Sequence, residues 1–160
     1  MNREAADPTN DGTQQQPMAL LATLDERGWA TLLRYTEAFS FQVGDVVLHA
    51  GDRDRSLCMV NEGRLEVLVE DESRATVRRI ALIEEGSVFG EQSFLDGQPR
   101  SADIRGVEAG RIRVLPFAAF EQLCQEDPAL AIALLLDLGR IVSQRLRDTT
   151  TFVGRLFADA

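Results

Sequence analysis

Five glycines divide the middle of the chain into short apolar runs, and this punctuation restricts the possible folds more than any other feature. They stand at Gly44, Gly51, Gly63, Gly86 and Gly90. Within one such run, Leu65, Val67 and Val69 stand two residues apart and would share one face of a strand. Many short strands separated by turns indicate an antiparallel β-barrel or sandwich. The expected strands cover residues 46–48, 57–60, 65–69, 76–83 and 111–115.

Helical periodicity flanks this β-rich centre on both sides. Apolar residues recur at helical spacing over residues 17–39, with a turn signal at 25–28, which predicts a short helical lead-in. After Pro116 the period is helical again, and Pro128 preceded by Asp127 as N-cap predicts the start of a long final helix. The expected fold is therefore mainly β with flanking helices: an antiparallel β-barrel or jelly roll, followed by a long C-terminal helix.

The composition of the chain sets its organisation. With 160 residues, of which 44% are hydrophobic, the chain has material for one ordinary core. We expect a disordered leader over residues 1–16, a domain of helical lead-in plus β-roll over 17–127, and a lid or dimerisation helix over 128–160.

Charge and cysteine content narrow the expected partners. A net charge of −9 without a dense Lys/Arg run predicts no direct contact with nucleic acid. Cys58 and Cys124 stand far apart, so neither a zinc site nor a disulfide framework is indicated. The polar residues 1–16 do not resemble a secretory signal, and the longest apolar run, 129–136, is far short of a bilayer span. We expect a cytoplasmic protein with no membrane contact and no metal.

The β pattern is interrupted between Ile83 and Ile104, and this interruption has the features of an anion site. It leaves room for a short helix over residues 91–95. Gly90 would let a ligand approach the backbone, and the amides of Gln92 and Ser93 at the helix N-terminus would present partial positive charge. The segment is therefore expected to hold a phosphate.

Two charged side chains complement that site. Gly97 and Pro99 return the chain so that Arg100 can meet phosphate oxygens with its planar fork. Glu91 is anionic and cannot bind phosphate, but its carboxylate is a natural acceptor for a ribose hydroxyl. The alternative is a surface salt bridge between Glu91 and Arg100, which would be worth only about 0–1 kcal/mol.

These residues resemble a known cassette. Phe89-Gly90-Glu91 followed by Pro99-Arg100-Ser101-Ala102 is similar to the phosphate-binding cassette of cyclic-nucleotide-binding domains. This family includes catabolite activator proteins, protein kinase A regulatory subunits and cyclic-nucleotide-gated channels. The same family's strand and turn signature is matched upstream by Phe41, Gly44-Asp45, Gly51-Asp52, Leu57, Val60 and Gly63. The resemblance covers roughly residues 20–153, and only Gln92-Ser93-Phe94 departs from the small-plus-Leu run usual after the glutamate.

The resemblance implies a role for each matching residue. Glu91 would bind the ribose hydroxyl and Arg100 the cyclic phosphate, while Ser101 and nearby amides would bind the phosphate or the base. From the final helix, Arg145 would pair with Glu91, and Thr149 and Thr150 would touch the purine. The predicted ligand-binding set is Val67, Ile80, Phe89, Gly90, Glu91, Gln92, Ser93, Arg100, Ser101, Ala102, Arg145, Thr149 and Thr150. Because Ser101 follows the arginine, cyclic GMP is slightly favoured over cyclic AMP.

The predicted function is that of a sensor or regulatory domain without catalysis. Positions on the final helix alternate three and four apart from Leu135 to Leu156, which is typical of a coiled-coil seam and predicts a homodimer. The helix would relay nucleotide occupancy to a partner or to an output domain. One alternative is a degenerate domain that serves only for dimerisation. A cupin-like enzyme is the other, but the single histidine, His49, is too few for the metal site that such barrels use.

Overall fold

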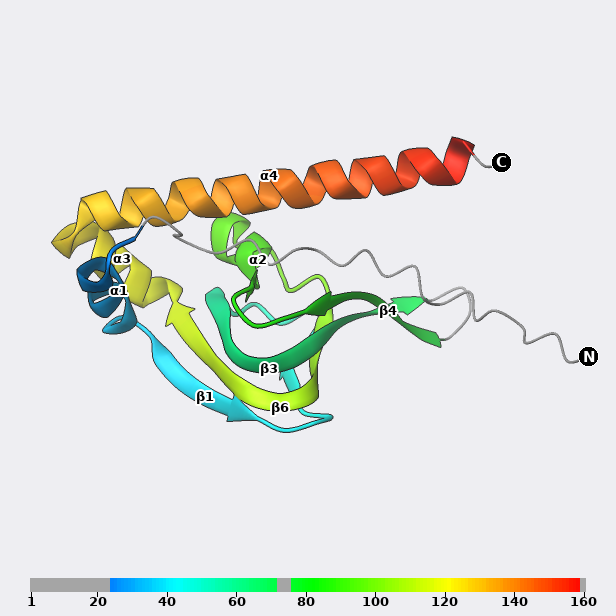
Figure 1. The fold of residues 1–160 in the computed structure, drawn as a ribbon, viewed down its shortest axis with the longest axis horizontal. Coiled ribbons are helices and arrows are strands. Elements are labelled where there is room, and N and C mark those ends of the chain that lie inside the picture. The colour runs from blue at the N-terminus through cyan, green and yellow to red at the C-terminus, as the bar shows by residue number, and fades with distance from the viewer. Residues whose placement is uncertain (1–23, 72–75, 159–160) are drawn as a thin grey trace, which may run out of the picture.

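The protein consists of an antiparallel β-roll with helices packed along one side (Figure 1). The computed structural model describes residues 24–71 and 76–158, so the expected leader over residues 1–16 lies outside them. The strands are β1 (Glu37–Phe41), β2 (Val46–Leu48), β3 (Ser56–Asp71), β4 (Thr76–Ile83), β5 (Val88–Phe89) and β6 (Asp103–Pro116). The helices are α1 (Glu26–Leu33), α2 (Glu91–Asp96), α3 (Phe117–Glu126) and α4 (Pro128–Ala158).

All strand pairs are antiparallel, which confirms the predicted fold class. The sheet runs in the order β1-β6-β3-β4, with β2 paired to β6 and β5 paired to β3. In the described part of the chain, β1 and β4 are edges that do not pair with each other, so the sheet is an open jelly-roll-like sandwich rather than a closed barrel.

Strand β3 is longer than the sequence pattern predicted. The expected strands over 57–60 and 65–69 are parts of this one strand, which bends strongly in Figure 1. Gly63, interpreted as a turn, instead lies at a register shift against β6, with φ +85°. A Cβ at Gly63 would lie 2.6 Å from the carbonyl oxygen of Ala109, so only glycine fits this β-bulge. Likewise, the strand expected over 111–115 is the end of the longer β6.

The helix boundaries confirm one predicted start and correct another. The Asp127 carboxylate accepts a hydrogen bond from the Leu130 amide (3.1 Å), so Asp127 caps α4 as predicted. The Asp25 carboxylate accepts from the Gly28 amide (2.8 Å), so the turn signal at 25–28 is the capped start of α1. The helical interpretation up to Phe39 is wrong, because that residue lies in β1 opposite Ile112 of β6.

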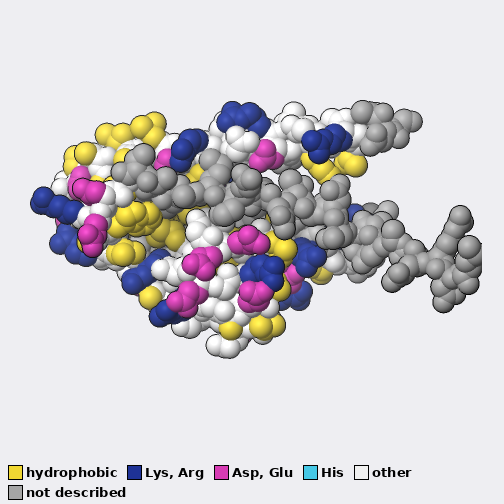
Figure 2. All heavy atoms as spheres, in the orientation of Figure 1, with side chains coloured by type: hydrophobic (Ala, Val, Ile, Leu, Met, Phe, Trp, Pro, Cys, Tyr) yellow, Lys and Arg dark blue, Asp and Glu magenta, His cyan; other side chains and the backbone are white. Residues whose placement is uncertain are grey.

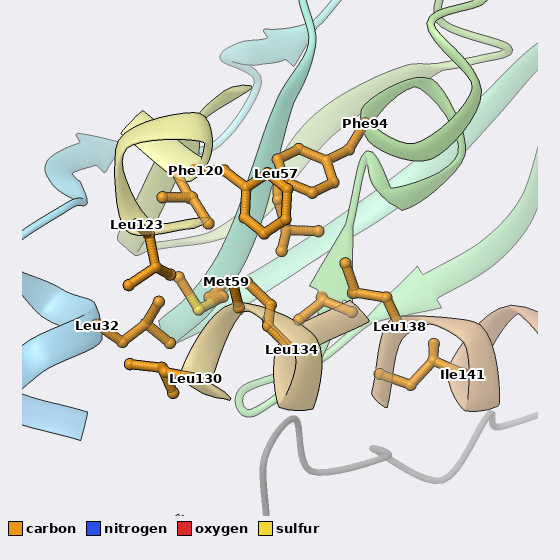
Figure 3. Close-up of a cluster of buried hydrophobic side chains, with 13 residues drawn as sticks. Leu32, Leu57, Met59, Phe94, Phe120, Leu123, Leu130, Leu134, Leu138 and Ile141 are labelled. Atoms are coloured by element: carbon orange, nitrogen blue, oxygen red, sulfur yellow. The ribbon is translucent and has the colours of Figure 1, made fainter. Parts of the chain in front are cut away.

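Two separate apolar clusters form the core. One lies inside the roll and consists of Phe41, Cys58, Val60, Leu65, Ile83, Phe89, Ile104 and Ile112. The other joins the sheet to the helices, with Leu57 and Met59 of β3, Phe94 of α2 and side chains of α1, α3 and α4 (Figure 3). Phe94 is fully buried there, so the short helix α2 is anchored to the helical layer.

The exposed surface carries charges of both signs. Acidic and basic side chains are interspersed over the face of the roll in Figure 2. Cross-strand ion pairs account for several of them, such as Arg111 with Glu62 and Arg105 with Glu66. No helix in the described ranges combines the length and apolar character that a membrane crossing requires.

Candidate functional site

A cavity of about 410 Å³ lies where α2, the roll and α4 meet, and α2 lies between the sheet and α4 in Figure 1. This volume lies within the usual range for small-molecule sites. Twelve of the thirteen predicted site residues line the cavity: Val67, Ile80, Phe89, Gly90, Glu91, Gln92, Ser93, Arg100, Ser101, Ala102, Arg145 and Thr149. Thr150 follows Thr149 on α4 but is not among the lining residues.

Arg100 is buried and held in one orientation by hydrogen bonds. Its Nη1 donates to the carbonyl oxygen of Gly90 (2.9 Å), and its Nη2 donates to the carbonyl oxygen of Ser56 (2.8 Å) and to the Asp54 carboxylate. The Arg100 backbone is fixed as well, because its amide donates to the Asp52 carbonyl (2.8 Å) and its carbonyl accepts from the Gly51 amide (2.8 Å). The guanidinium is therefore positioned before any ligand arrives.

One N–H donor of the Arg100 guanidinium lacks an acceptor among the described residues. The Arg100 Nε–H is buried and has no acceptor among the residues that the structure describes. A buried donor without an acceptor costs about 1–3 kcal/mol, so an oxygen atom of a bound anion would be favourable at this point. This unsatisfied donor belongs to the side chain that sequence reasoning assigned to the phosphate.

Asp54 and Ser56 complete the surroundings of Arg100, and sequence reasoning missed both. The Ser56 hydroxyl and the Arg100 guanidinium both donate to the Asp54 carboxylate. Burial acts to raise the pKa of Asp54, but these hydrogen bonds and the charge of Arg100 outweigh it and hold that pKa below its usual value of 3.8. Asp54 is therefore an anion that keeps the cationic arginine in place.

Glu91 is also buried and paired. Its carboxylate forms an ion pair with Arg145 Nη1 of α4 (2.7 Å), which is the contact that the sequence predicted. Arg145 Nη2 also donates to the Val88 carbonyl of β5 (2.7 Å). A carboxylate offers about four lone-pair sites, so Glu91 can accept from a ligand hydroxyl while it holds Arg145. The pair also joins the cavity to the middle of α4.

Gly90 is needed at its position, although for a different reason from the predicted one. It caps α2 with φ +76°, a conformation that side chains disfavour. A Cβ on Gly90 would lie 2.6 Å from Arg100 Nη1 and 3.0 Å from the Ser56 carbonyl oxygen. The close approach that requires glycine here is therefore to the Arg100 side chain.

The predicted hydroxyl groups already have partners. Ser101 donates to the side-chain oxygen of Gln92 (3.4 Å) at the exposed rim. Thr149 and Thr150 donate to the carbonyls of Arg145 and Leu146 in their own helix (both 2.9 Å). In these rotamers the threonine hydroxyls can only accept a hydrogen bond from a ligand, which suits the amino group of a purine.

The remaining lining residues are apolar and were not singled out from the sequence. They are Leu48, Val69, Ala81, Ile83 and Ile104. Val69 shares the strand alternation of Val67, which was the available signal, whereas the others depend on how β2, β4 and β6 pair. Together they supply an apolar wall of the kind that a nucleobase would pack against.

The site offers little for metal binding or nucleophilic catalysis. Within the described ranges there is no group of three or more histidine, cysteine or acidic residues suited to a metal ion. The lining residues include neither His49 nor either cysteine. Burial raises the pKa of the Cys58 thiol to about 12, so that thiol stays protonated and unreactive.

The fold is an antiparallel β-roll whose cavity is lined by a buried guanidinium held in one orientation. The chain belongs to the cyclic nucleotide-binding domain family, whose family model matches residues 38–127. This confirms the resemblance noted from the cassette.

Individual relatives extend the comparison. Vfr, a cAMP-activated global transcriptional regulator of Pseudomonas aeruginosa, is 29% identical over 78% of this chain and 58% of its own length. Lysophospholipase NTE1 of Pyricularia oryzae is 28% identical over 74% of this chain and 8% of its own length. Among solved structures, the catabolite activator protein of Thermus thermophilus has a TM-score of 0.76 at 24% identity, covering 86% of this chain and 62% of that one. The chain thus spans less than two thirds of each of these proteins.

The comparisons correct one prediction. A direct nucleic-acid partner was excluded on the net charge of −9, but the relative Vfr is a transcriptional regulator. The exclusion is wrong because electrostatic fields are screened within about 8–10 Å, so the charge of one domain says nothing about partners met elsewhere in a longer protein. The lysophospholipase relative likewise means that family membership alone does not exclude an enzyme.

Proposed function

We propose that this chain binds a 3′,5′-cyclic nucleotide and acts as a signalling sensor or regulatory domain. The observation that carries the proposal is the convergence of two buried charges, Arg100 and Glu91, on one cavity of nucleotide size. Burying charged groups is costly, and both are held by specific partners, so this arrangement is more than a surface salt bridge.

In this proposal the cyclic phosphate meets Arg100. The buried Nε–H gains an acceptor, and the guanidinium keeps its contacts with Gly90, Ser56 and Asp54. Because α2 has six residues, its dipole is small, and the first-turn amides of Gln92 and Ser93 act as individual hydrogen-bond donors. A 3′,5′-cyclic nucleotide has one free ribose hydroxyl, at the 2′ position, and Glu91 accepts from it.

The base packs against Val67, Ile80 and the apolar wall described above. Thr149 accepts from an exocyclic amino group, which both adenine and guanine carry. Ser101 favours cyclic GMP in the prediction from sequence, whereas the relative Vfr is named as cAMP-activated. Both ligands therefore belong in the experiment.

The proposed assembly is a homodimer through α4. The predicted seam includes Leu138, which is buried in the chain's own core, and Arg145, which binds Glu91. A neighbouring seam with the same three-and-four spacing is instead exposed or lined with small residues: Ile132, Leu136, Gly139, Ser143, Leu146, Thr150, Val153 and Phe157. Exposed leucine and phenylalanine at such spacing favour pairing with a second copy of the helix.

The proposal is tested by ligand-induced stabilisation. Cyclic AMP or cyclic GMP is expected to raise the unfolding midpoint, because a ligand that binds only the native state stabilises that state. The linear nucleotides 5′-AMP and 5′-GMP are expected to leave the midpoint unchanged. Arg100→Lys is expected to lower the calorimetric affinity by about 2 kcal/mol or more, because lysine lacks the planar fork. Arg53→Lys, at an exposed arginine of the preceding loop, is the matched control.

Two outcomes would contradict the proposal. If neither cyclic nucleotide shifts the midpoint, the alternative of a degenerate dimerisation domain is favoured. If the linear monophosphate accumulates during incubation with the cyclic nucleotide, the protein turns its ligand over and is an enzyme rather than a sensor.

The expected cytoplasmic location and the relay to an output domain also stay predictions.

A further inference from the structure

Arg55, which immediately precedes β3, contacts the end of α2 that points away from the cavity. Its Nη2 donates to the Phe94 carbonyl (2.9 Å) and its Nε donates to the Ser93 carbonyl (3.4 Å). The last carbonyls of a helix have no partner within the helix, so the Arg55 guanidinium supplies a donor to the Phe94 carbonyl and a second, longer contact to the Ser93 carbonyl. Arg55 therefore caps the C-terminus of the helix that begins with Glu91.

The same guanidinium lies over an aromatic ring of the next helix. The Arg55 Cζ atom is 3.5 Å from the ring centroid of Phe117, the first residue of α3. The Phe117 ring meets the Phe94 ring edge to face, with centroids 5.3 Å apart. Arg55 thus contacts α2 through hydrogen bonds and α3 through a cation–π interaction.

The turn after α2 is shaped to admit this arginine. Gly97 ends the helix with φ +70° and donates to the same Ser93 carbonyl that Arg55 contacts (3.0 Å). The side chain of Arg55 passes 3.6 Å from the point where a Gly97 Cβ would stand. Arg55 itself is not among the residues that line the cavity, so its role is not to touch the ligand.

We propose that Arg55 is a positioning residue that couples α2 to the helical layer of α1, α3 and α4. When a nucleotide binds Glu91 and Arg100, it is expected to displace the N-terminal end of α2. Because Arg55 holds the other end of that short helix against Phe117, α2 moves together with α3 rather than independently of it. This inference rests on the proposed nucleotide binding.

The chain contains its own reporter for this coupling. Trp29 is the only tryptophan, and it packs from α1 against the cluster that joins the helices to the sheet. Its fluorescence therefore reports on the helical layer, whereas calorimetry reports on binding. In the wild-type protein, the cyclic nucleotide is expected to change both.

The experiment compares full-length Arg55→Gln, Arg55→Lys and Phe117→Leu with an Arg53→Gln control. Arg55→Gln is expected to weaken cyclic nucleotide binding by about 3- to 10-fold and to reduce the nucleotide-dependent change in Trp29 fluorescence to less than about half. Arg55→Lys keeps a cation over the ring and should recover part of that signal. Phe117→Leu removes the aromatic ring that Arg55 contacts but keeps an apolar side chain. Because both changes break the same contact, the double variant Arg55→Gln/Phe117→Leu should lose little more affinity and fluorescence change than either single variant.

The outcomes are separable. If Arg55→Gln binds nucleotide and changes Trp29 fluorescence as the wild type does, or if the wild type binds with no fluorescence change, the coupling inference is wrong. A fall in the unfolding midpoint with both nucleotide readouts unchanged would make Arg55 a purely structural cap, and would also overturn the inference. If the wild-type protein binds no cyclic nucleotide, the proposed function fails instead.

Discussion

At the scale of single residues, the site depends on how its buried charges are compensated. Arg100 and Glu91 are almost completely buried, and each forms an ion pair with a partner of its own: Asp54 for the arginine and Arg145 for the glutamate. This separation leaves the two charges to bind different parts of one ligand. It also makes the contribution of each residue measurable on its own.

The role of Glu91 can be tested with a modified ligand. A 2′-deoxy cyclic nucleotide lacks the hydroxyl that Glu91 is proposed to accept from, so wild-type affinity should fall by about 1.5–3 kcal/mol, the usual worth of a hydrogen bond to a charged group. In Glu91→Gln the deoxy penalty should be much smaller, because the strong acceptor is already lost. Titration calorimetry measures the affinity of wild type and Glu91→Gln for the cyclic nucleotide and for its 2′-deoxy form. If removal of the 2′-hydroxyl lowers the affinity of both proteins equally, Glu91 does not contact the ribose.

Asp54 predicts a dependence of stability on pH. Its pKa is lowered in the folded protein, so its contribution is present above the ordinary value of 3.8 and is lost as the pH falls below 3.8 through the folded value. At neutral pH, Asp54→Asn should lower the free energy of unfolding by less than about 1 kcal/mol, because the carboxylate is half exposed. Urea unfolding at neutral pH and below pH 3.8 measures this difference, with exposed Asp52→Asn as control. A difference that persists unchanged in acid would contradict the assignment.

At the scale of secondary-structure elements, local patterns were a good guide wherever the element was defined by its own residues. The strands 46–48 and 76–83, the short helix after Gly90 and the capped start of α4 were predictable because alternation, glycine and capping signals are local. Most of the cavity lining was predictable too, because the cassette is one contiguous segment.

The rest depended on contacts that are distant in sequence. Gly63 is read as a turn from its neighbours, and only the pairing of β3 with β6 reveals a bulge within one strand. Asp54 meets Arg100 across 46 positions, and no periodicity encodes that contact. Phe39 fits a helical spacing, but it lies in β1 because it pairs with Ile112 of β6. Here a contact distant in sequence outweighs the local pattern.

Two glycines provide a matched pair for testing the cap of α2. Gly90 and Gly86 both have positive φ, at +76° and +82°, so alanine at either should cost about 1–2 kcal/mol of stability. Only at Gly90 would the added Cβ meet Arg100, since Gly86 faces open space. Gly90→Ala should therefore weaken cyclic nucleotide binding by at least about tenfold, and Gly86→Ala should leave it unchanged. Similar affinities for the two variants in calorimetry would argue against a positioned arginine.

At the scale of the whole molecule, the two apolar clusters give the roll and the helical layer separate cores. The cluster inside the roll belongs to the strands, whereas the other is shared by the helices α1, α2, α3 and α4 and the strands β3, β5 and β6. Interiors packed at crystal density resist deformation, so a rearrangement is easier between two clusters than within one. The second cluster contains strand residues as well as helices, so these elements are expected to move together relative to the interior of the roll.

The exposed seam of α4 predicts the effect of a charge. If the helix pairs with a second copy, Leu146→Glu should place two carboxylates in the interface and weaken dimerisation by at least about tenfold. Arg147→Glu, one position along and off the seam, makes a larger change in charge and should leave the dimer intact. Light scattering across a concentration series measures both, and a wild-type chain that is monomeric throughout would refute the assembly.

The unbroken length of α4 has a mechanical consequence. A helix of 31 residues is about 46 Å long, and its first half is packed on the core while Phe152, Val153, Leu156 and Phe157 near its end are exposed. A rigid rod of that length, tilted by about 10° at its base, sweeps about 8 Å at its tip. Arg145 lies about 26 Å along this rod, so a shift at its contact with Glu91 would be nearly doubled at the tip, where a neighbouring polypeptide could detect it.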